Sequence, residues 1–326
     1  MTTSAAALRV GVVVPSYRRP DDLAACLATL AAQQRAADEV VVVLREDDDA
    51  GRRAAASAGR DLPLRVVAPA APGFVPALRA GLAAATTDVV ACTDDDARPR
   101  PDWLARIAAG FREDPDLAAL GGRDARPQAP TSYRHGGDVG SLSWWGRMVG
   151  RHEESWPEPT DVAHLRGANM AFRAPAPLPD AGLRGDGTAN EADMCLAAGL
   201  RGRVRYDPAL VVDHLVSPRP GSDADGTTRG VSALRGAADR ASNVALVLAK
   251  HTPATTQRAV RLGYLLMVGH RASPGPVRVL VTGWPGSSRV RAATALARAC
   301  ASGWRAGSRA RAGVGAEPRT PGPRVA

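Results

Sequence analysis

Residues 8–30 read LRVGVVVPSYRRPDDLAACLATL, a continuous apolar run followed by an amphipathic pattern. The run at residues 8–14 ends at Pro15 and is typical of a strand buried on both faces of a sheet. Pro20 and the two aspartates after it favour the start of a helix, because proline and acidic side chains suit a helix N-terminus. A strand followed directly by a helix is the unit from which parallel sheets are built.

The same alternation continues towards residue 123. Apolar runs predict further strands at residues 39–44, 64–67 and 88–92, and residues 74–85 place apolar side chains at helical spacing. Repeated units of this kind predict an α/β fold, with a Rossmann-like, mostly parallel sheet flanked by helices. In such folds ligands bind beyond the carboxyl ends of the strands.

Three aspartates, Asp94, Asp95 and Asp96, follow the strand at residues 88–92. Like charges this close repel one another unless a cation lies between them, and a divalent metal ion is the usual cation. In an extended chain Asp94 and Asp96 point to the same side, so both can face one ion. The sequence therefore indicates a metal site, with a solvated acidic turn as the alternative.

The composition is that of a globular protein. Of the 326 residues, 45% are hydrophobic and 23% are charged, which excludes a disordered, fibrous or membrane-embedded chain. No apolar run approaches the roughly 20 residues that cross a bilayer, and the N-terminus lacks the pattern of a secretory signal. We therefore expect a cytoplasmic protein. The four cysteines form no CxxC pair and are expected to be reduced core residues.

The excess positive charge is confined to the C-terminal part. The net charge of +9 divides into −3 for residues 1–249 and +12 for residues 250–326. Basic amphipathic helices suit an anionic membrane surface, so peripheral binding to the inner face of the cytoplasmic membrane is one interpretation. The alternative is that these helices only cover the α/β domain and the tail keeps the protein soluble. Because no recognised nucleic-acid-binding module accompanies the charge, no nucleic acid partner is expected.

Composition also predicts how the chain divides. Helical patterns follow the α/β part at residues 231–249, 256–270 and 287–301. The last residues are rich in Gly, Pro, Ala and Arg and are predicted to be disordered. We therefore expect an α/β domain, a helical C-terminal extension and a disordered basic tail, at residues 1–225, 226–302 and 303–326.

An irregular stretch at residues 126–161 interrupts the α/β pattern and is predicted to be a functional loop region. It contains Trp144, Trp145 and Trp156, whose rings either stack on a sugar or pack an insertion.

A Gly-containing strand at residues 164–173 and a short helix at residues 188–200 are expected next. Thr188 and Glu191 fit a capping box at the start of this helix. Glu191 and Asp193 have two interpretations: they complement the helix dipole, or they supply a general base held in a fixed position.

Five segments, in this order, resemble the family 2 glycosyltransferases, which are inverting enzymes of the GT-A fold. They are VVVPSYRRPDDLAACLATLAAQ (12–33), ALRAGLAAA (77–85), DVVACTDDDARPRPDWL (88–104), RGANMAFR (166–173) and NEADMCLAAG (190–199), the last followed by Asp213 and His214. The resemblance covers residues 8–215 and implies the GT-A form of the α/β fold predicted above.

The resemblance implies a metal-binding DXD motif at Asp94 to Asp96, with Asp96 as metal ligand and Asp94 directed to the donor's ribose or to the metal. His214 matches a position that completes the metal or diphosphate site, and the implied ion is Mg²⁺ or Mn²⁺. Glu191 takes the place of the catalytic base, with Asp193 close behind it.

The resemblance also implies binding residues for both substrates. The partners are a nucleoside-diphosphate sugar donor and an acceptor that the sequence does not identify. Donor contacts are expected from Pro15, Ser16, Tyr17, Arg45, Asp47, Arg79, Asp94 and Asp95. Acceptor contacts are expected from Trp144, Trp145, Gly167, Asn169 and Met170.

One departure concerns recognition of the nucleotide base. Family members place an aspartate directly after the second strand, whereas this chain has Leu44, Arg45 and Glu46 there. Either Asp47 or Asp48 substitutes, or the base is recognised differently, and Arg45 would then approach a phosphate.

The function expected from these features is metal-dependent, inverting glycosyl transfer to a hydroxyl acceptor, lipid-linked, of the cell envelope or of a natural product. The alternative is a catalytically decayed GT-A binding protein tethered to membrane by its basic C-terminus. A nucleotidyltransferase is set aside, because the loop after the first strand lacks the glycines of a phosphate-binding loop.

Overall fold

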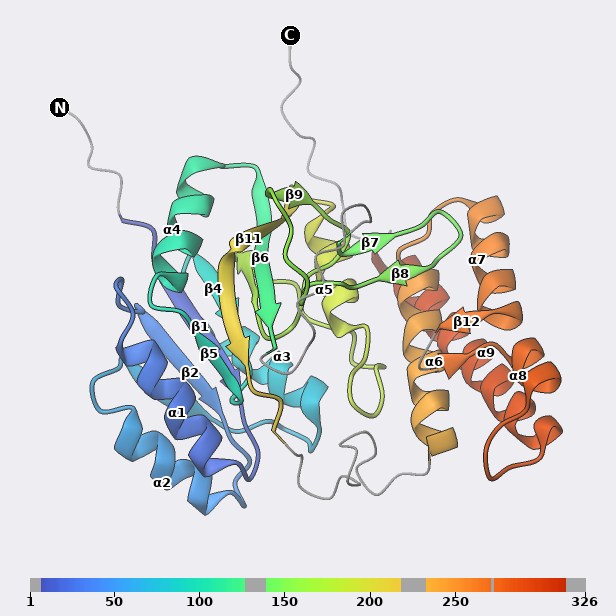
Figure 1. The fold of residues 1–326 in the computed structure, drawn as a ribbon, viewed down its shortest axis with the longest axis horizontal. Coiled ribbons are helices and arrows are strands. Elements are labelled where there is room, and N and C mark those ends of the chain that lie inside the picture. The colour runs from blue at the N-terminus through green and yellow to red at the C-terminus, as the bar shows by residue number, and fades with distance from the viewer. Residues whose placement is uncertain (1–6, 127–138, 218–232, 271–272, 315–326) are drawn as a thin grey trace, which may run out of the picture. The chain divides into compact units, whose positions relative to one another are not determined.

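The computed structural model describes residues 7–126, 139–217, 233–270 and 273–314, which form two compact units (Figure 1). The described N-terminal unit holds residues 7–126, 139–143, 147–181 and 185–217. The C-terminal unit holds residues 144–146, 182–184 and the helices from residue 233 onward.

The N-terminal unit is built on a sheet that has nine strands in the described part of the chain. They are β1 (Val10–Pro15), β2 (Glu39–Val43), β3 (Leu64–Val67), β4 (Val89–Cys92), β5 (Ala97–Pro99), β6 (Leu117–Ala125), β9 (Thr160–Asp161), β10 (Met170–Arg173) and β11 (Arg203–His214). Their order is β3-β2-β1-β4-β10-β6-β11-β5, and β9 pairs with β11. The strands β3, β2, β1 and β4 are parallel, as are β6 and β11, whereas β10, β5 and β9 run antiparallel to their neighbours.

Helices cover both faces of this sheet. They are α1 (Pro20–Ala31), α2 (Asp49–Ala58), α3 (Phe74–Ala84), α4 (Trp103–Glu113) and α5 (Asn190–Ala198). Alternate valines of β1 divide between two apolar layers, with Val12 and Val14 in one and Val13 in the other. The first layer includes side chains of α1, α2 and α4, and the second includes those of α3 and α5. Burial on both faces explains why the strands read as continuous apolar runs.

The predicted α/β architecture, with a mostly parallel sheet flanked by helices, is confirmed. The structure differs from the strand expected at residues 164–173, because only the last four of these residues form a strand, β10. Residues 166–169 turn instead, because the Asn169 backbone N–H donates to the carbonyl of Arg166. The helix α2 was not among the expected elements, and only Gly51 and Ala55 among its residues are buried.

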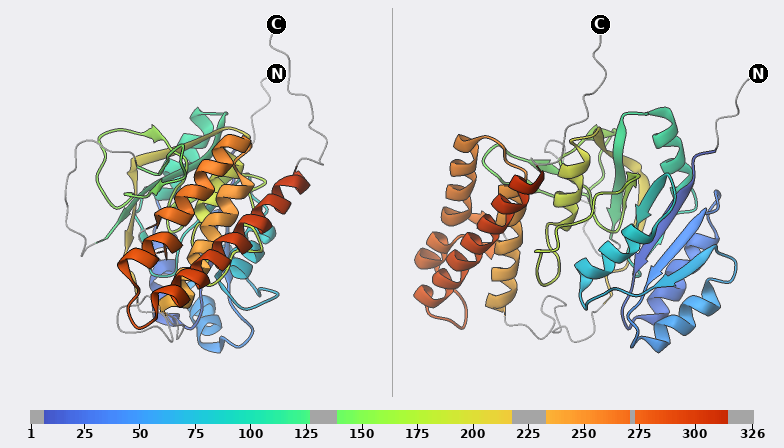
Figure 2. Two further views of the ribbon diagram at one scale, coloured as in Figure 1. Left: turned by 90° about the vertical axis from the view of Figure 1, so that its right-hand side faces the viewer. Right: turned by 180° about the vertical axis from the view of Figure 1, so that it is seen from behind.

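Four helices and a short hairpin make up most of the C-terminal unit (Figure 2, left). They are α6 (Ala233–Lys250), α7 (Thr255–Met267), β12 (Gly269–His270), β13 (Ser273–Pro274), α8 (Pro276–Thr282) and α9 (Arg289–Val314). The helix predicted at residues 287–301 is longer in the structure, because α9 continues to Val314. Residues 303–314, which were predicted to belong to a disordered tail, are therefore helical. Residues 315–326 lie outside the described residues.

Close packing against α6 explains the longer helix. A Cβ atom on Gly303 would lie 1.9 Å from the carbonyl oxygen of Ser242, and one on Gly307 would lie 2.0 Å from that of Leu246. Only glycine permits this approach of the two backbones. The Gly-rich composition that predicted disorder therefore forms a helix–helix contact.

The cysteines Cys26, Cys92, Cys195 and Cys300 are buried and unbonded to one another, as predicted. Among the described residues, no helix combines the length and the apolarity needed to cross a bilayer.

Candidate active site

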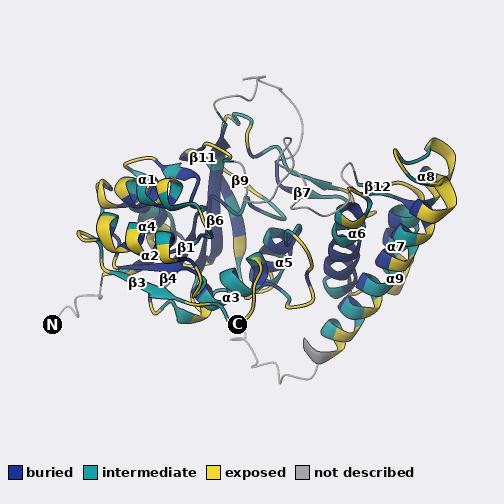
Figure 3. Ribbon diagram, turned by 90° about the horizontal axis from the view of Figure 1, so that it is seen from below, coloured by how far each residue is buried: buried dark blue, intermediate teal, exposed yellow. Residues whose placement is uncertain are grey.

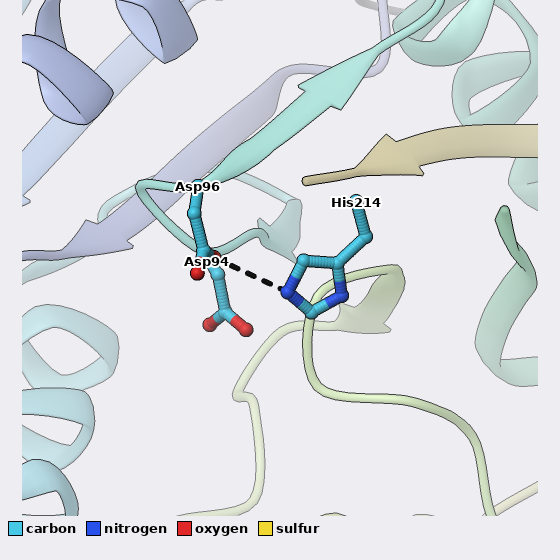
Figure 4. A group of neighbouring side chains, drawn as sticks. All are labelled: Asp94, Asp96 and His214. Atoms are coloured by element: carbon cyan, nitrogen blue, oxygen red, sulfur yellow. Dashed lines mark ion pairs between the residues drawn. The ribbon is translucent and has the colours of Figure 1, made fainter. Parts of the chain in front are cut away.

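Strand pairing brings Asp94, Asp96 and His214 together at the carboxyl end of β4 (Figure 4). The strand β4 ends at Cys92, and β5 begins at Ala97, directly after the aspartates. His214 is the last residue of β11 and lies opposite Ala97 in the antiparallel pair. Its Nε2 atom is therefore only 3.2 Å from an oxygen of Asp96.

The chemistry of these side chains fits a divalent cation. Each of the three offers one ligand atom, and these atoms lie within 4.8 Å of one another. Two carboxylates and an imidazole form a mixed oxygen and nitrogen donor set, which suits Mn²⁺ and is compatible with Mg²⁺. The structure thus brings together the three residues that the sequence predicted as metal ligands.

A further carboxylate, Asp124 of β6, fixes the other side of the His214 ring. Nδ1 of His214 is 2.7 Å from Oδ1 of Asp124, so the imidazole bridges Asp96 and Asp124. Asp124 is fully buried and also forms ion pairs with Arg126 and Arg166, at 3.1 and 3.3 Å. A carboxylate in this place orients a ligating histidine.

The electrostatics of the cluster keep Asp96 ionised. Burial would raise the pKa of Asp96, but hydrogen bonding to His214 and the charge of Arg19 outweigh burial and hold it well below its usual range. Burial likewise opposes a charge on His214, yet its hydrogen bonds to Asp124 and Asp96 raise its pKa to about 9. Burial and the neighbouring Asp96 raise the pKa of Asp94. A cation at the cluster would favour the ionised form of Asp94 and would take the place of the proton on Nε2 of His214.

Arg19, in the loop after β1, is a site residue that the sequence analysis missed. Its guanidinium nitrogens lie 2.5 Å from Oδ1 of Asp95 and 2.7 Å from Oδ2 of Asp96. Asp95 is fully buried, and burial raises its pKa to about 7 although the charge of Arg19 opposes this rise. Asp95 thus binds Arg19, which places a positive charge beside the predicted metal ligands.

The loops after β1 and β4 run side by side at the same edge. The Ser16 backbone N–H donates to the carbonyl of Val43, and that of Thr93 donates to Val13. Pro15 ends β1 and is half-buried, and Ser16 is buried. Within the described residues, the buried Oγ1 of Thr93 has no hydrogen-bond partner. A buried polar group without a partner is uncommon in proteins and marks this edge of the sheet.

Tyr17 lies in a cluster of arginines after β1 and β2. The guanidinium of Arg45 lies 4.7 Å from the centre of the Tyr17 ring and also pairs with Asp47 at 2.9 Å. Asp48 is buried, and its carboxylate accepts hydrogen bonds from the backbone N–H groups of Arg18 and Gly51. Of the two aspartates considered for base recognition, Asp48 is therefore a helix cap and Asp47 remains exposed.

Glu191 lies in the first turn of α5 and is half-buried. Asn190 Nδ2 donates to Oε2 of Glu191 at 3.0 Å. A Cβ atom on Gly167 would lie 3.2 Å from Oε1 of Glu191, so the glycine leaves room at this carboxylate. Burial raises the pKa of Glu191, although the nearby charge of Arg166 lowers it. These properties suit a proton acceptor.

The predicted capping box at Thr188 and Glu191 is wrong. The residue before the helix is Ala189, with a left-handed φ of 73°, and the helix begins at Asn190. Thr188 lies one position too early, and its N–H and hydroxyl both donate to Asp186.

Several other predicted site residues hold the fold together instead. Asp193 is buried and accepts the Asp180 backbone N–H at 2.7 Å. Asn169 is fully buried: it accepts from Trp103 Nε1 and donates to two backbone carbonyls. Met170 lies in the apolar core, and the contact of Asn169 and Met170 with the acceptor stays a prediction. Arg79 donates to the carbonyl of Pro179 at 2.5 Å.

The tryptophans of the irregular region divide between the two units. Trp144 and Trp145 belong to the C-terminal unit and are 55% and 48% exposed. The carbonyl of Trp144 accepts from Arg261 Nε in that unit. Trp156 belongs to the N-terminal unit and donates to the carbonyl of Arg151.

Comparison with known proteins gives a match over half of the chain. The model of a family described as Glycosyl transferase family 2 matches residues 11–175. No curated protein matches the chain. A solved structure of the mannosyltransferase PcManGT from Pyrobaculum calidifontis, in complex with GDP-Man and Mn²⁺, is 22% identical with a TM-score of 0.54, covering 93% of this chain and 84% of its own.

A second solved structure, S. aureus TarS 1-349, is 13% identical with a TM-score of 0.57, covering 94% of this chain and 91% of its own. The same protein in complex with UDP-GlcNAc is 15% identical with a TM-score of 0.51, covering 94% and 92%. At these identities the likeness shows a shared fold.

Proposed function

We propose that this chain, which belongs to glycosyl transferase family 2, moves a sugar from a nucleoside-diphosphate donor to a hydroxyl acceptor with inversion at the anomeric carbon. The observation that carries the proposal is the group formed by Asp94, Asp96 and His214 at the carboxyl end of β4, where open α/β sheets bind nucleotides. The Mn²⁺ and nucleotide-sugar complexes of similarly folded proteins support it.

In this proposal Asp96 and His214 hold a Mn²⁺ or Mg²⁺ ion, and Asp94 contacts the ion or the donor's ribose. A bound ion would supply positive charge to the diphosphate as it leaves the sugar. Asp124 keeps the His214 ring in place through the Nδ1 contact. Arg19 holds a second positive charge beside the same carboxylates.

Glu191 is the proposed general base. Its carboxylate takes the proton of the acceptor hydroxyl while that oxygen forms a bond to the anomeric carbon. The bond from this carbon to the diphosphate oxygen breaks in the same step, so a single displacement inverts the configuration. Burial makes the carboxylate a better proton acceptor, because it raises the pKa of Glu191.

Donor contacts are proposed from Pro15, Ser16 and Tyr17 at the end of β1 and in the loop after it. Arg45 and Asp47 lie where an aspartate was expected to recognise the base, so base recognition is proposed to involve the Tyr17 ring and this ion pair. The similar structures carry GDP-Man in one case and UDP-GlcNAc in the other. The proposal therefore names a nucleoside-diphosphate sugar as donor class and leaves its base to experiment.

The test is calorimetric titration of the full chain with UDP, GDP and dTDP, each with and without Mn²⁺. We expect one nucleotide to bind in a metal-dependent way, and Asp96→Ala to abolish this binding. Asp102→Ala is the matched control, because Asp102 pairs with Arg106 on the surface of the N-terminal unit. Absence of binding under every condition would contradict the proposal, and binding without any transfer or hydrolysis would favour the decayed binding protein.

A further inference from the structure

Much of the short helix α8 is exposed to solvent (Figure 3). Val277, Leu280 and Val281 are 37%, 46% and 70% exposed. Because they are spaced three and four residues apart, they lie on one side of the helix. Val279, by contrast, is fully buried on the side that packs within the unit. Val281 is therefore mostly outside the packing of α8 against α7 and α9, and Val277 and Leu280 are partly outside it.

Neighbouring segments extend this face. The Gly275 backbone N–H donates to the carbonyl of Val268, so the end of α7 lies beside the start of α8. Met267 and Val268 there are 56% and 45% exposed. We define the α8 face as these two residues together with Val277, Leu280 and Val281. It is a cluster of exposed apolar side chains rather than a single exposed residue.

The charges around the α8 face have one sign. Arg278 on α8 and Arg289 on α9 are exposed, and a Cβ atom on Gly283, at the end of α8, would lie 3.6 Å from Arg289 Nε. Residues 240–316 contain twelve basic side chains and no Asp or Glu. Apolar side chains among arginines, without carboxylates, match the boundary between anionic headgroups and acyl chains.

We propose that the α8 face docks on an anionic lipid bilayer. The Val and Leu side chains enter the interface, and Arg278 and Arg289 contact headgroup phosphates. The helix lies on the bilayer and does not cross it. This proposal concerns the C-terminal unit and does not depend on the glycosyl transfer proposed for the N-terminal unit.

Two other occupants fit the face less well. A second copy of the chain would bring the same arginines together, and residues 240–316 supply no carboxylate to separate them. A nucleic acid would match the arginines but would leave Leu280 and Val281 against phosphates, where apolar side chains contribute nothing. A bilayer satisfies both kinds of side chain.

The experiment is co-sedimentation of the full chain with vesicles of phosphatidylcholine alone and of phosphatidylcholine mixed with phosphatidylglycerol. We expect binding only to the anionic vesicles. The double variant Leu280→Glu, Val281→Glu should partition at least about tenfold less. The matched control is Leu200→Glu, since Leu200 is 77% exposed but belongs to the N-terminal unit, and it should bind like the wild type.

A second variant removes charge and keeps the apolar side chains. Arg278→Gln with Arg289→Gln should weaken binding by about fivefold per arginine, and added salt should remove the difference. If circular dichroism shows that the acidic double variant has unfolded, this arginine variant serves as the test of membrane docking.

Three results would overturn the proposal. They are failure of the wild type to bind anionic vesicles, equal binding by the acidic double variant and the wild type, and a dimer in light scattering that this variant converts to a monomer. Nucleotide binding by the same preparations is measured separately, so a failure of membrane docking is distinguishable from a failure of the proposed transferase activity.

Discussion

Two runs of three aspartates follow neighbouring parts of the same sheet, and the structure uses them differently. Asp47, Asp48 and Asp49 come after β2, and Asp94, Asp95 and Asp96 come after β4. The first run leads into a helix, so Asp48 caps α2 while Asp47 and Asp49 remain exposed. The second run leads into β5, which pairs with β11.

The difference lies in what the rest of the chain brings to each run. Pairing of β5 with β11 places His214 beside Asp96, and the loop after β1 places Arg19 beside Asp95 and Asp96. In the described part of the chain, the side chains that pair with the first run are those of Arg18 and Arg45. An aspartate triplet therefore becomes a candidate metal site through its long-range neighbours, and the triplet itself is not sufficient.

The largest effect is expected on enzymatic turnover, which a substitution in the second run should lower and one in the first run should not. Asp96→Ala should lower turnover with a competent donor and acceptor by about 10⁴-fold, because it removes a proposed ligand of the cation that would stabilise the departing diphosphate. Asp49→Ala, the equivalent change in the first run, should leave turnover within about twofold of the wild type. Steady-state kinetics in saturating Mn²⁺ measures both. Equal losses in the two variants would contradict the distinction.

Glu191→Gln should lower turnover by about 10³-fold, because the amide cannot accept the acceptor's proton. A base must be ionised to act, so wild-type activity should rise with pH through the pKa of Glu191, which burial raises above the ordinary 4.5. The pH–rate profile measures this acidic limb, which should vanish in Glu191→Gln.

Glu113→Gln is the control for this experiment, since Glu113 is an exposed glutamate at the end of α4. It should keep both the rate and the acidic limb of the wild type. An acidic limb at or below pH 4.5 in the wild type would contradict the effect of burial on Glu191.

A smaller effect is expected at Asp124, which contacts the proposed metal ligand His214. Asp124→Asn should weaken Mn²⁺ binding by about 10- to 100-fold, because the neutral amide holds the His214 ring less firmly. Electron paramagnetic resonance of free Mn²⁺ measures the affinity. Asp213→Asn is the matched control, because Asp213 is adjacent in sequence and pairs with Arg100. Equal affinities in the two variants would show that Asp124 does not position the ring.

The smallest effect concerns the stability of the first run. Asp48→Ala should lower the free energy of unfolding by about 1 kcal/mol, because it removes the side-chain cap of α2. Asp49→Ala should cost no more than about 0.5 kcal/mol, since Asp49 only complements the helix dipole. Urea unfolding measures both, and Mn²⁺ affinity should stay unchanged. A loss of Mn²⁺ affinity in Asp48→Ala would indicate that the first run, and not only the second, binds the metal ion.

Much of the sheet could be predicted from the sequence, because strands buried on both faces are continuous apolar runs. The strands at Val10–Pro15, Glu39–Val43 and Val89–Cys92 all have this pattern. The position of Asp94 and Asp96 followed from the end of such a run. Local pattern was also sufficient to place Glu191 in the first turn of a helix.

Residues whose roles depend on long-range contacts could not be predicted. Arg19 and Asp124 become part of the site only when four strands, β1, β4, β6 and β11, meet. Arg19 and Asp96 are 77 positions apart in the sequence, and Asp124 and His214 are 90 positions apart. Asn169 had the sequence of a binding motif but serves as a buried hydrogen-bonding bridge. The Gly and Ala composition of residues 303–314 concealed a helix whose contacts need small residues.

We propose that the run after β4 binds a divalent cation and that the run after β2 does not. Mn²⁺ titration of three proteins tests it most directly: the wild type, Asp94→Ala with Asp96→Ala, and Asp47→Ala with Asp49→Ala. We predict one Mn²⁺ site that the first double variant loses and the second retains with unchanged affinity. Retention of the site in the first double variant, or its loss in the second, would contradict the assignment of the metal site to the run after β4.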